Sequence, residues 1–439
     1  MSKTSVTNKE GMVQHAFFMA VTTGVRLLTG VVLFVLLARK LGPTDFGLFA
    51  YWVTVTSLLC LLVDYGFTPK ILREVAKEPE SARKALGDAL VTKIGFSICL
   101  FLALAIAPFI FNLDSRDVVL MFSLMVAAIG FSFGDFICAP FRALDSYGEE
   151  TKIVVFTSIV HFVLVYGAAV LGLGLESIVI VFAVSRIIYS CTSFISSFKV
   201  LGKPVWPKNK LACFIKEARD GFYYALDMGM ANLYLQIDTV LIKLYLGSHA
   251  VGVYQAGAKL AQGFYTLPQI ASNLYLPRIA RVESNPPQLA KVLLDSSIQL
   301  FVSGFIGYLV FAFGATFFQE VIFGPEYAEL KDIFPLFGLL VFTRYYLASL
   351  GFAISGLGFQ QYRFKVTVLM CLVLAALSPF IVPSFGLRGF ILLLIGVTLV
   401  STVSYYYKLF ANGIAVGYAR PIMSFFILLL GFNLYATHR

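Results

Sequence analysis

The sequence is poor in charge, because only 13% of its 439 residues are Asp, Glu, Lys or Arg, while 59% are hydrophobic. A soluble domain usually has about a quarter of its residues charged, so this composition excludes an ordinary water-soluble protein. The six cysteines are scattered singly without a C-x-x-C pair, which favours packing roles over a zinc site or a disulfide framework. Composition therefore predicts a chain that lies in a lipid bilayer.

Catalytic motifs are also lacking. The sequence contains no G-x-x-x-x-G-K-[ST] phosphate loop, no H-E-x-x-H and no G-x-S-x-G. The longest loop expected on the outer side, around residues 319–332, has acidic residues without the pattern of a cation-binding loop. We therefore expect no enzyme activity and no cofactor or metal. The first apolar run lacks a small-residue cleavage site and is expected to stay in the mature protein.

Long apolar runs dominate what is present. A spanning helix needs about 20 apolar residues, and twelve runs meet or approach that length: 14–38, 46–65, 86–111, 118–141, 153–173, 177–198, 222–246, 251–276, 292–318, 333–357, 364–383 and 389–410. A thirteenth run, 422–436, is too short to span comfortably, and three alternatives stay open: it lies at the interface, packs as a partial helix, or crosses with tilt and local thinning of the bilayer. The fold class predicted is an all-α integral membrane protein with about twelve transmembrane helices.

An internal repeat organises these runs. Residues 36–50 (LLARKLGPTDFGLFA) align with residues 241–255 (LIKLYLGSHAVGVYQ), so that Gly42 matches Gly247. Further along, PKILR at residues 69–73 matches PRIAR at residues 277–281. Ordered matches at nearly constant offset predict a duplicated unit of roughly two hundred residues.

Two six-helix bundles follow from this repeat. We expect residues 1–205 to form the first bundle, residues 206–410 the second, and residues 411–439 a tail with a short extra helix. Both copies start on the same side of the membrane, which indicates parallel repeats around a central cavity. The polar segment 199–221 would link the bundles and is expected to face lipid headgroups.

Basic residues in the connections predict the orientation. Most of them, including those of the 199–221 linker, share a side with the N-terminus, and only Arg39, Lys40, Arg116, Lys331 and Arg388 fall on the other side. The positive-inside rule therefore places the N-terminus in the cytoplasm. The net charge of +10 is explained by these loops, and no nucleic-acid partner is implied.

Charged residues inside the apolar runs are the candidate functional residues. The basic ones are Arg26, Lys93, Arg186, Lys243, Lys259 and Arg344, and the acidic ones are Asp135, Asp227 and Asp238. Each basic residue costs about 2.5–3.5 kcal/mol at mid-bilayer unless it faces the protein interior, a wet cavity or the interface. Two interpretations stay open: the charges neutralise one another as structural ion pairs, or the deep basic residues of both halves line one anion-binding cavity.

Two further observations concern single helices. Asp227 and Asp238 are eleven residues apart, which places them about 20° from alignment on one helical face and roughly 16 Å apart along it. His161 stands alone in an apolar run, and a hydrogen-bonded packing residue is the favoured interpretation over a proton relay.

Several motifs resemble a known family. ARKLGPTDFGLFAY at residues 38–51, DYGFTPKILREVAK at 64–77, DTVLIKLYLGSHAVGVYQAGAKL at 238–260, LPRIAR at 276–281 and FGPEYAE at 323–329 resemble the polysaccharide transporter family. These are the Wzx-type O-antigen flippases of the multidrug/oligosaccharidyl-lipid/polysaccharide exporter superfamily. The L-G-x-x-x-[FV]-G-[LV]-[FY] signature occurs in both halves.

The resemblance implies a multi-pass flippase of the bacterial cytoplasmic (inner) membrane. Its substrate would be an undecaprenyl-pyrophosphate-linked oligosaccharide, moved by alternating access and coupled to H+ or Na+. Membrane lipids, a polysaccharide polymerase and a chain-length regulator would be its other partners. On this hypothesis Arg26, Arg186, Lys259 and Arg344 contact the substrate, and Asp227, Asp238 and Asp135 act in coupling or gating.

Two alternatives are open. A drug exporter of the same fold would be expected to bury more acids than bases, whereas here the basic residues outnumber the acidic ones. An integral-membrane polymerase or ligase would act on the same lipid-linked sugar, and short outer loops without catalytic groupings count against it.

Overall fold

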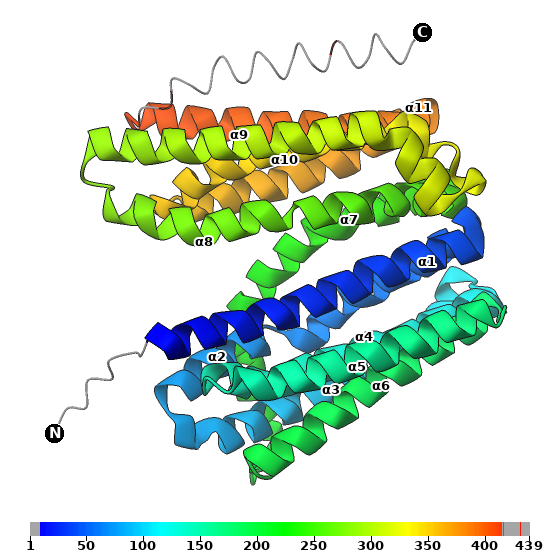
Figure 1. The fold of residues 1–439 in the computed structure, drawn as a ribbon. Coiled ribbons are helices and arrows are strands. Elements are labelled where there is room, and N and C mark those ends of the chain that lie inside the picture. Colours follow the sequence, from blue (N-terminus) through cyan, green and yellow to red (C-terminus); the bar gives the residue numbers. More distant parts are fainter. Residues whose placement is uncertain (1–8, 415, 417–430, 432–439) are drawn as a thin grey trace. The chain divides into compact units, whose positions relative to one another are not determined.

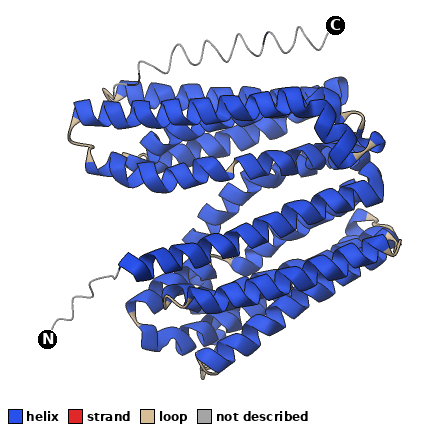
Figure 2. Cartoon of the chain, in the orientation of Figure 1, coloured by secondary structure: helices blue, strands red, loops and turns tan. Residues whose placement is uncertain are grey.

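The computed structural model describes residues 9–414, 416 and 431, and within these residues the chain folds into helices joined by short loops, without any strand (Figures 1 and 2). Two 3-10 turns, η1 and η3, and one π-helical turn, η2, accompany the α-helices. In chain order the elements are α1 (Lys9–Asp64), α2 (Phe67–Lys77), η1 (Pro79–Ser81), α3 (Ala82–Phe111), α4 (Ser115–Ala143), α5 (Tyr147–Val170), α6 (Leu175–Val200), α7 (Lys210–Phe264), α8 (Thr266–Arg281), α9 (Pro286–Phe317), η2 (Phe318–Phe323), η3 (Pro325–Tyr327), α10 (Leu330–Gly356) and α11 (Gln360–Ala411). The predicted all-α class is confirmed.

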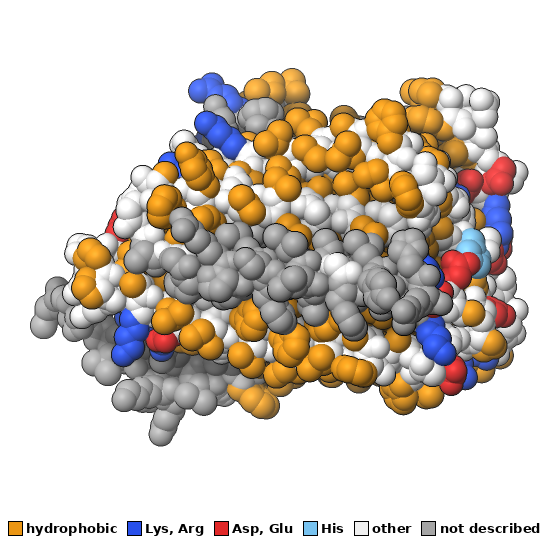
Figure 3. Space-filling model, turned by 90° about the horizontal axis from the view of Figure 1, so that it is seen from above, with side chains coloured by type: hydrophobic (Ala, Val, Ile, Leu, Met, Phe, Trp, Pro, Cys, Tyr) orange, Lys and Arg blue, Asp and Glu red, His pale blue; other side chains and the backbone are white. Residues whose placement is uncertain are grey.

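The helices suit a membrane. Eight helical stretches of the described residues are long and apolar enough to cross one. Apolar side chains on the outer faces of these helices are exposed, for example Phe109 (83% exposed) and Phe313 (85%). Such exposure is unfavourable in water but not in the apolar interior of a bilayer. On the face drawn in Figure 3, hydrophobic side chains are spread over the described surface between the two ends, and charged side chains gather toward the left and right ends.

The count of twelve crossings stays a prediction. Two of the apolar stretches, residues 17–77 and 360–411, each contain two of the predicted runs separated by a break in the helix. The short run 422–436 lies outside the described residues apart from position 431, and so does most of the tail.

Glycine breaks α1 and α7 at matching places. Gly42 in α1 has φ 70° and ψ 169°, and Gly247 in α7 has φ 83° and ψ −175°. A residue with a Cβ atom is strained at such positive φ values, so glycine is favoured at both positions. These two glycines were aligned in the sequence repeat, and their shared backbone conformation shows that the repeat is structural.

The chain divides into two compact units. The first contains residues 1–40 and 49–236, and the second contains residues 41–48 and 237–439. The domain bounds drawn from the sequence, 1–205, 206–410 and 411–439, stay a prediction. Residues 206–236, placed in the second bundle by the sequence, are grouped with the first unit in the structure. The central cavity between the bundles also stays a prediction.

Within each unit one or two helices form the centre. In the first unit α4 packs against α5 and α6, and α2 packs against α3 and α4 through Phe67, Ile71 and Val75. In the second unit α10 packs against α8, α9 and α11 (Figure 1). This arrangement puts Asp135 of α4, Arg186 of α6 and Arg344 of α10 on helices with several neighbours, where polar side chains need partners.

Candidate polar sites in the two units

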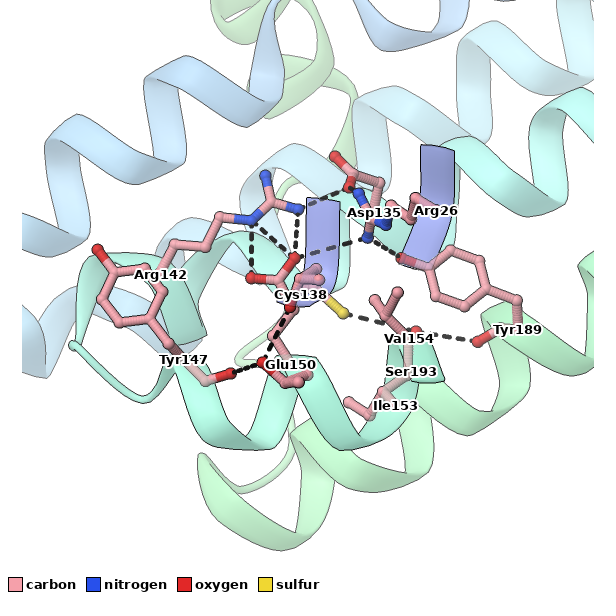
Figure 4. A network of polar contacts seen from close by, with 12 residues as sticks. Arg26, Asp135, Cys138, Arg142, Tyr147, Glu150, Ile153, Val154, Tyr189 and Ser193 are labelled. Atoms are coloured by element: carbon pink, nitrogen blue, oxygen red, sulfur yellow. Dashed lines mark hydrogen bonds and ion pairs between the residues drawn. The ribbon is translucent and has the colours of Figure 1, made fainter. Parts of the chain in front are cut away.

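A network of four charged residues lies in the first unit (Figure 4). Asp135 accepts from Arg26 Nη1 at 2.9 Å and from Arg142 Nη2 at 2.6 Å. Glu150, whose side chain is only 5% exposed, lies 2.9 Å from Arg142 Nη2 and 3.5 Å from Arg26 Nη2. Arg26 also donates to the hydroxyl of Tyr189 at 2.9 Å. The positive charges of two guanidinium groups are therefore neutralised by two carboxylates inside a membrane-embedded unit.

Helical spacing explains how this network assembles. Asp135 and Arg142 are seven residues apart in α4, which places them two turns apart on one face. The short turn after α4 then returns the chain so that Glu150, in the first turn of α5, reaches Arg142. Arg142 and Glu150 lie just outside the apolar runs 118–141 and 153–173, so neither was among the candidate charged residues inside those runs. Their short spacing across a tight turn was the available signal.

Arg186 lies next to this network with a different set of partners. Its guanidinium carbon lies 5.1 Å from the ring centre of Phe131 and 5.2 Å from that of Phe182. Arg26 lies 5.9 Å from the same Phe131 ring, so the structure brings these two predicted residues together. Among the described residues no carboxylate forms an ion pair with Arg186, whose nitrogen Nη2 instead lies 3.1 Å from His161 Nε2.

The hydrogen bonds of His161 fix its tautomer. The Ser185 hydroxyl donates to the carbonyl of Phe182 at 2.6 Å, which leaves the Ser185 oxygen to accept from Nδ1–H of His161 at 2.7 Å. Nε2 then carries no hydrogen and accepts from Arg186. His161 is 3% exposed. This buried, hydrogen-bonded placement is the one favoured by the sequence analysis.

A second polar cluster lies in the second unit around Asp238 of α7. Its carboxylate accepts from the Tyr254 hydroxyl at 2.6 Å, and from the backbone N–H and hydroxyl of Thr239 at 2.6 and 3.1 Å. Gln255 in turn donates to the Thr239 hydroxyl. The break at Gly247 lies between these residues in the sequence. The break changes the direction of α7, so residues sixteen positions apart come into contact.

Two predicted basic residues belong to the same cluster. Arg344 donates to the Tyr265 hydroxyl at 3.2 Å and lies 5.2 Å from the centre of that ring. Lys259 donates to Gln262 at 3.1 Å. Both cations act electrostatically on Asp238. The structure thus gathers three of the predicted residues in the second unit, while the side chain of Asp227 lies outside the described residues.

An ion pair between Lys93 and Asp64 in the first unit was only partly foreseen. Lys93 was expected either to face the interior or to reach for the interface, and its side chain is fully buried. Its Nζ lies 2.7 Å from Asp64 and 2.5 Å from the Ser132 hydroxyl, and Ser132 also binds Asp64. This pair joins the end of α1 to α3 and α4, which indicates a structural role.

Comparison with known proteins identifies the class. A family model described as polysaccharide biosynthesis protein matches residues 12–282. This match spans more than half of the chain, so the chain belongs to the polysaccharide biosynthesis protein family. Over 341 residues it is 21% identical to a protein of Escherichia coli (strain K12) that is inferred to be an O-antigen transporter. That alignment covers 73% of this chain and 78% of the relative.

Solved structures confirm the fold. The lipid II flippase MurJ in an inward closed conformation superposes with a TM-score of 0.66 at 14% identity, covering 96% of this chain and 97% of MurJ. An inward-facing multidrug resistance MATE family transporter of the MOP superfamily gives a TM-score of 0.64 at 14% identity, covering 91% and 94%. The family match and the Escherichia coli relative confirm the predicted resemblance to the polysaccharide transporter family, and the chain has the fold of these two transporters.

Proposed function

We propose that this protein is a flippase of the bacterial cytoplasmic membrane that moves undecaprenyl-pyrophosphate-linked oligosaccharide repeat units from the inner to the outer leaflet. The family membership, the O-antigen transporter relative and the lipid II flippase fold support a flippase of lipid-linked sugars. Transport would proceed by alternating access with coupling to H+ or Na+. A polysaccharide polymerase and a chain-length regulator would act beside it.

The observation that carries the proposal is the environment of Arg186. Its guanidinium group contacts two aromatic rings and one neutral hydrogen-bond acceptor, and among the described residues no carboxylate forms an ion pair with it. A guanidinium group in this setting can give two parallel hydrogen bonds to a pyrophosphate. The lipid tail of such a substrate would stay in the bilayer. Arg26, in contrast, already has two carboxylate partners.

The second unit supplies the other proposed contacts. Arg344 and Lys259 would bind the pyrophosphate or acidic sugars, and Asp238 would be the coupling carboxylate. Asp238 suits that role because its partners are hydroxyl and amide groups, which tolerate both its charged and its protonated form. Asp135, held between two arginines, would act as a gating ion pair.

Purified Arg186→Gln protein in vesicles tests this proposal. We expect the movement of a labelled undecaprenyl-pyrophosphate sugar between leaflets to fall roughly 10- to 100-fold, because a hydrogen bond to a charged group contributes about 1.5–3 kcal/mol. Arg281→Gln, at an exposed position in the last turn of α8, is the matched control and should transport like the wild type.

Two results would contradict the proposal. Wild-type rates in Arg186→Gln would remove Arg186 from the binding site. Lengthened sugar chains after incubation with wild-type protein would show a polymerase in place of a flippase.

A further inference from the structure

The segment between α6 and α7 and the first turns of α7 carry exposed apolar side chains between exposed lysines. The apolar ones are Val205 (47% exposed), Trp206 (50%), Leu211 (69%) and Ile215 (58%). Lys203, Lys208, Lys210 and Lys216 are exposed around them. We call these eight side chains the linker surface.

The linker surface is fixed against the first unit. The backbone N–H of Val205 donates to the carbonyl of Arg83 at 2.9 Å, and Arg83 Nε donates to the carbonyl of Lys203 at 2.8 Å. A Cβ atom on Gly87 would overlap the Val205 carbonyl, so α3 and the segment touch along their backbones. This segment therefore presents a constant face and is not a loose tether.

The start of α7 is held in the same way. Phe214 packs against Phe96 of α3 with ring centres 5.2 Å apart, and Glu217 pairs with Lys70 of α2 at 2.5 Å. Leu211 and Ile215 are four residues apart and therefore share one face of α7, and both are exposed while Glu217 is buried. This apolar face is therefore exposed, while other residues at the start of α7 pack against the first unit.

The contacts with α3 place the linker surface at the membrane boundary. Val205 is level with Arg83, the second residue of α3, whereas the Cys213 Sγ atom lies 3.7 Å from the carbonyl of Asp88. Five residues of helix separate these two levels, or roughly 8 Å along α3. The chain thus runs from the first turn of α3, at the level of Val205, toward the apolar part of that helix, at the level of Cys213.

We propose that the linker surface binds the anionic phospholipid headgroups of the leaflet on the N-terminal side of the membrane. Tryptophan and lysine are favoured at this depth, and juxtamembrane lysines attract anionic lipids. Residues 199–216 contain no Asp or Glu, so the charged side chains of the segment itself are all positive. Lys210 also lies 6.0 Å from the centre of the Trp206 ring, next to where a headgroup would sit. The inference does not rest on the proposed function.

Quenching of Trp206 fluorescence by brominated lipids tests this inference. The full-length protein is placed in vesicles with either brominated phosphatidylglycerol or brominated phosphatidylcholine as the minor lipid. Trp52 is the only other tryptophan, and a Trp206→Phe variant measures its share of the signal for subtraction. We expect the anionic lipid to quench Trp206 several-fold more strongly, with about a fivefold preference for each lysine that contacts a headgroup.

The matched variant combines Lys203→Gln, Lys208→Gln, Lys210→Gln and Lys216→Gln, which are exposed positions outside the proposed transport site. In this variant, and in the wild type at high salt, the preference for the anionic lipid should disappear while quenching by both lipids persists. Equal quenching by both lipids in the wild type would overturn the proposal, because the contact would then be apolar only. Absence of quenching by either lipid would also overturn it, since another part of the protein would then cover Trp206.

Discussion

His161 and Arg186 show how one neutral side chain can hold a cation in place inside a membrane. Nε2 of His161 can accept from Arg186 only while it carries no hydrogen, and the bond from Nδ1–H to Ser185 maintains that state. The histidine is therefore a positioning residue for the arginine proposed to bind the pyrophosphate.

Replacing His161 should weaken transport through Arg186. We expect His161→Leu to raise the substrate concentration for half-maximal transport about tenfold, because a hydrogen bond to a charged group is lost. His161→Asn, which keeps an acceptor, should recover part of that loss. A purely structural role would lower the amount of folded protein in both variants and leave this concentration unchanged, and a titration of transport against substrate distinguishes the two.

Glu150 offers a second test at the scale of single residues. Glu150→Gln leaves two arginines facing only Asp135, and breaking a buried ion pair costs about 3–5 kcal/mol. The apparent Tm of the purified protein should fall by several degrees. Its neighbour Glu149 pairs with the exposed Lys152, and Glu149→Gln should change stability by less than about 1 kcal/mol. Equal Tm values for the two variants would show that the network does not stabilise the first unit.

At the scale of helices, the repeat signature has a physical explanation in the second unit. A Cβ atom on Gly47 would overlap the carbonyl of Ser248, and one on Gly252 would overlap the carbonyl of Pro43. The two copies of the signature therefore pack against each other backbone to backbone. Its first glycines, Gly42 and Gly247, adopt positive φ values, and its second glycines allow the close approach.

Gly252→Ala should destabilise the protein for this reason. The added methyl group must displace a carbonyl of the backbone, and overpacking of this kind costs about 1–3 kcal/mol. Gly167→Ala in α5 is the control, because a Cβ atom there would meet nothing within 4 Å beyond the backbone of its own helix, and alanine favours a helix. A lower apparent Tm in Gly252→Ala, together with an unchanged or higher one in Gly167→Ala, is expected. The reverse order would contradict the close packing.

The same helices show what could be predicted from the sequence. Hydropathy and the repeat predicted the helical class and the matching glycines, since these depend on runs and spacing along the chain. Hydropathy and the repeat could not predict which neighbouring helix the polar side chains of each helix face. The inward turn of Arg142, and its pairing with Glu150 and Asp135, depend on how α1, α4 and α5 pack. For the same reason, Arg26 and Arg186 looked alike in the sequence but have different partners.

For the whole molecule, the basic connections predict orientation. A small protease-sensitive tag at the N-terminus should be cut only when protease reaches the cytoplasmic side of inside-out membrane vesicles, because basic loops are retained there. A tag in the connection around Lys331 should be cut only from the other side. Cleavage of both tags from one side would contradict the predicted topology.

The proposed transport of lipid-linked sugars depends on recognition of a pyrophosphate by partly buried cations. The most direct measurement compares two labelled lipids with the same sugar in vesicles that contain the purified protein, one with a pyrophosphate link and one with a neutral link. We predict that the pyrophosphate lipid changes leaflet at least tenfold faster than the neutral one, roughly the effect of one charged contact, without a change in mass. Equal rates for the two lipids would contradict the central claim.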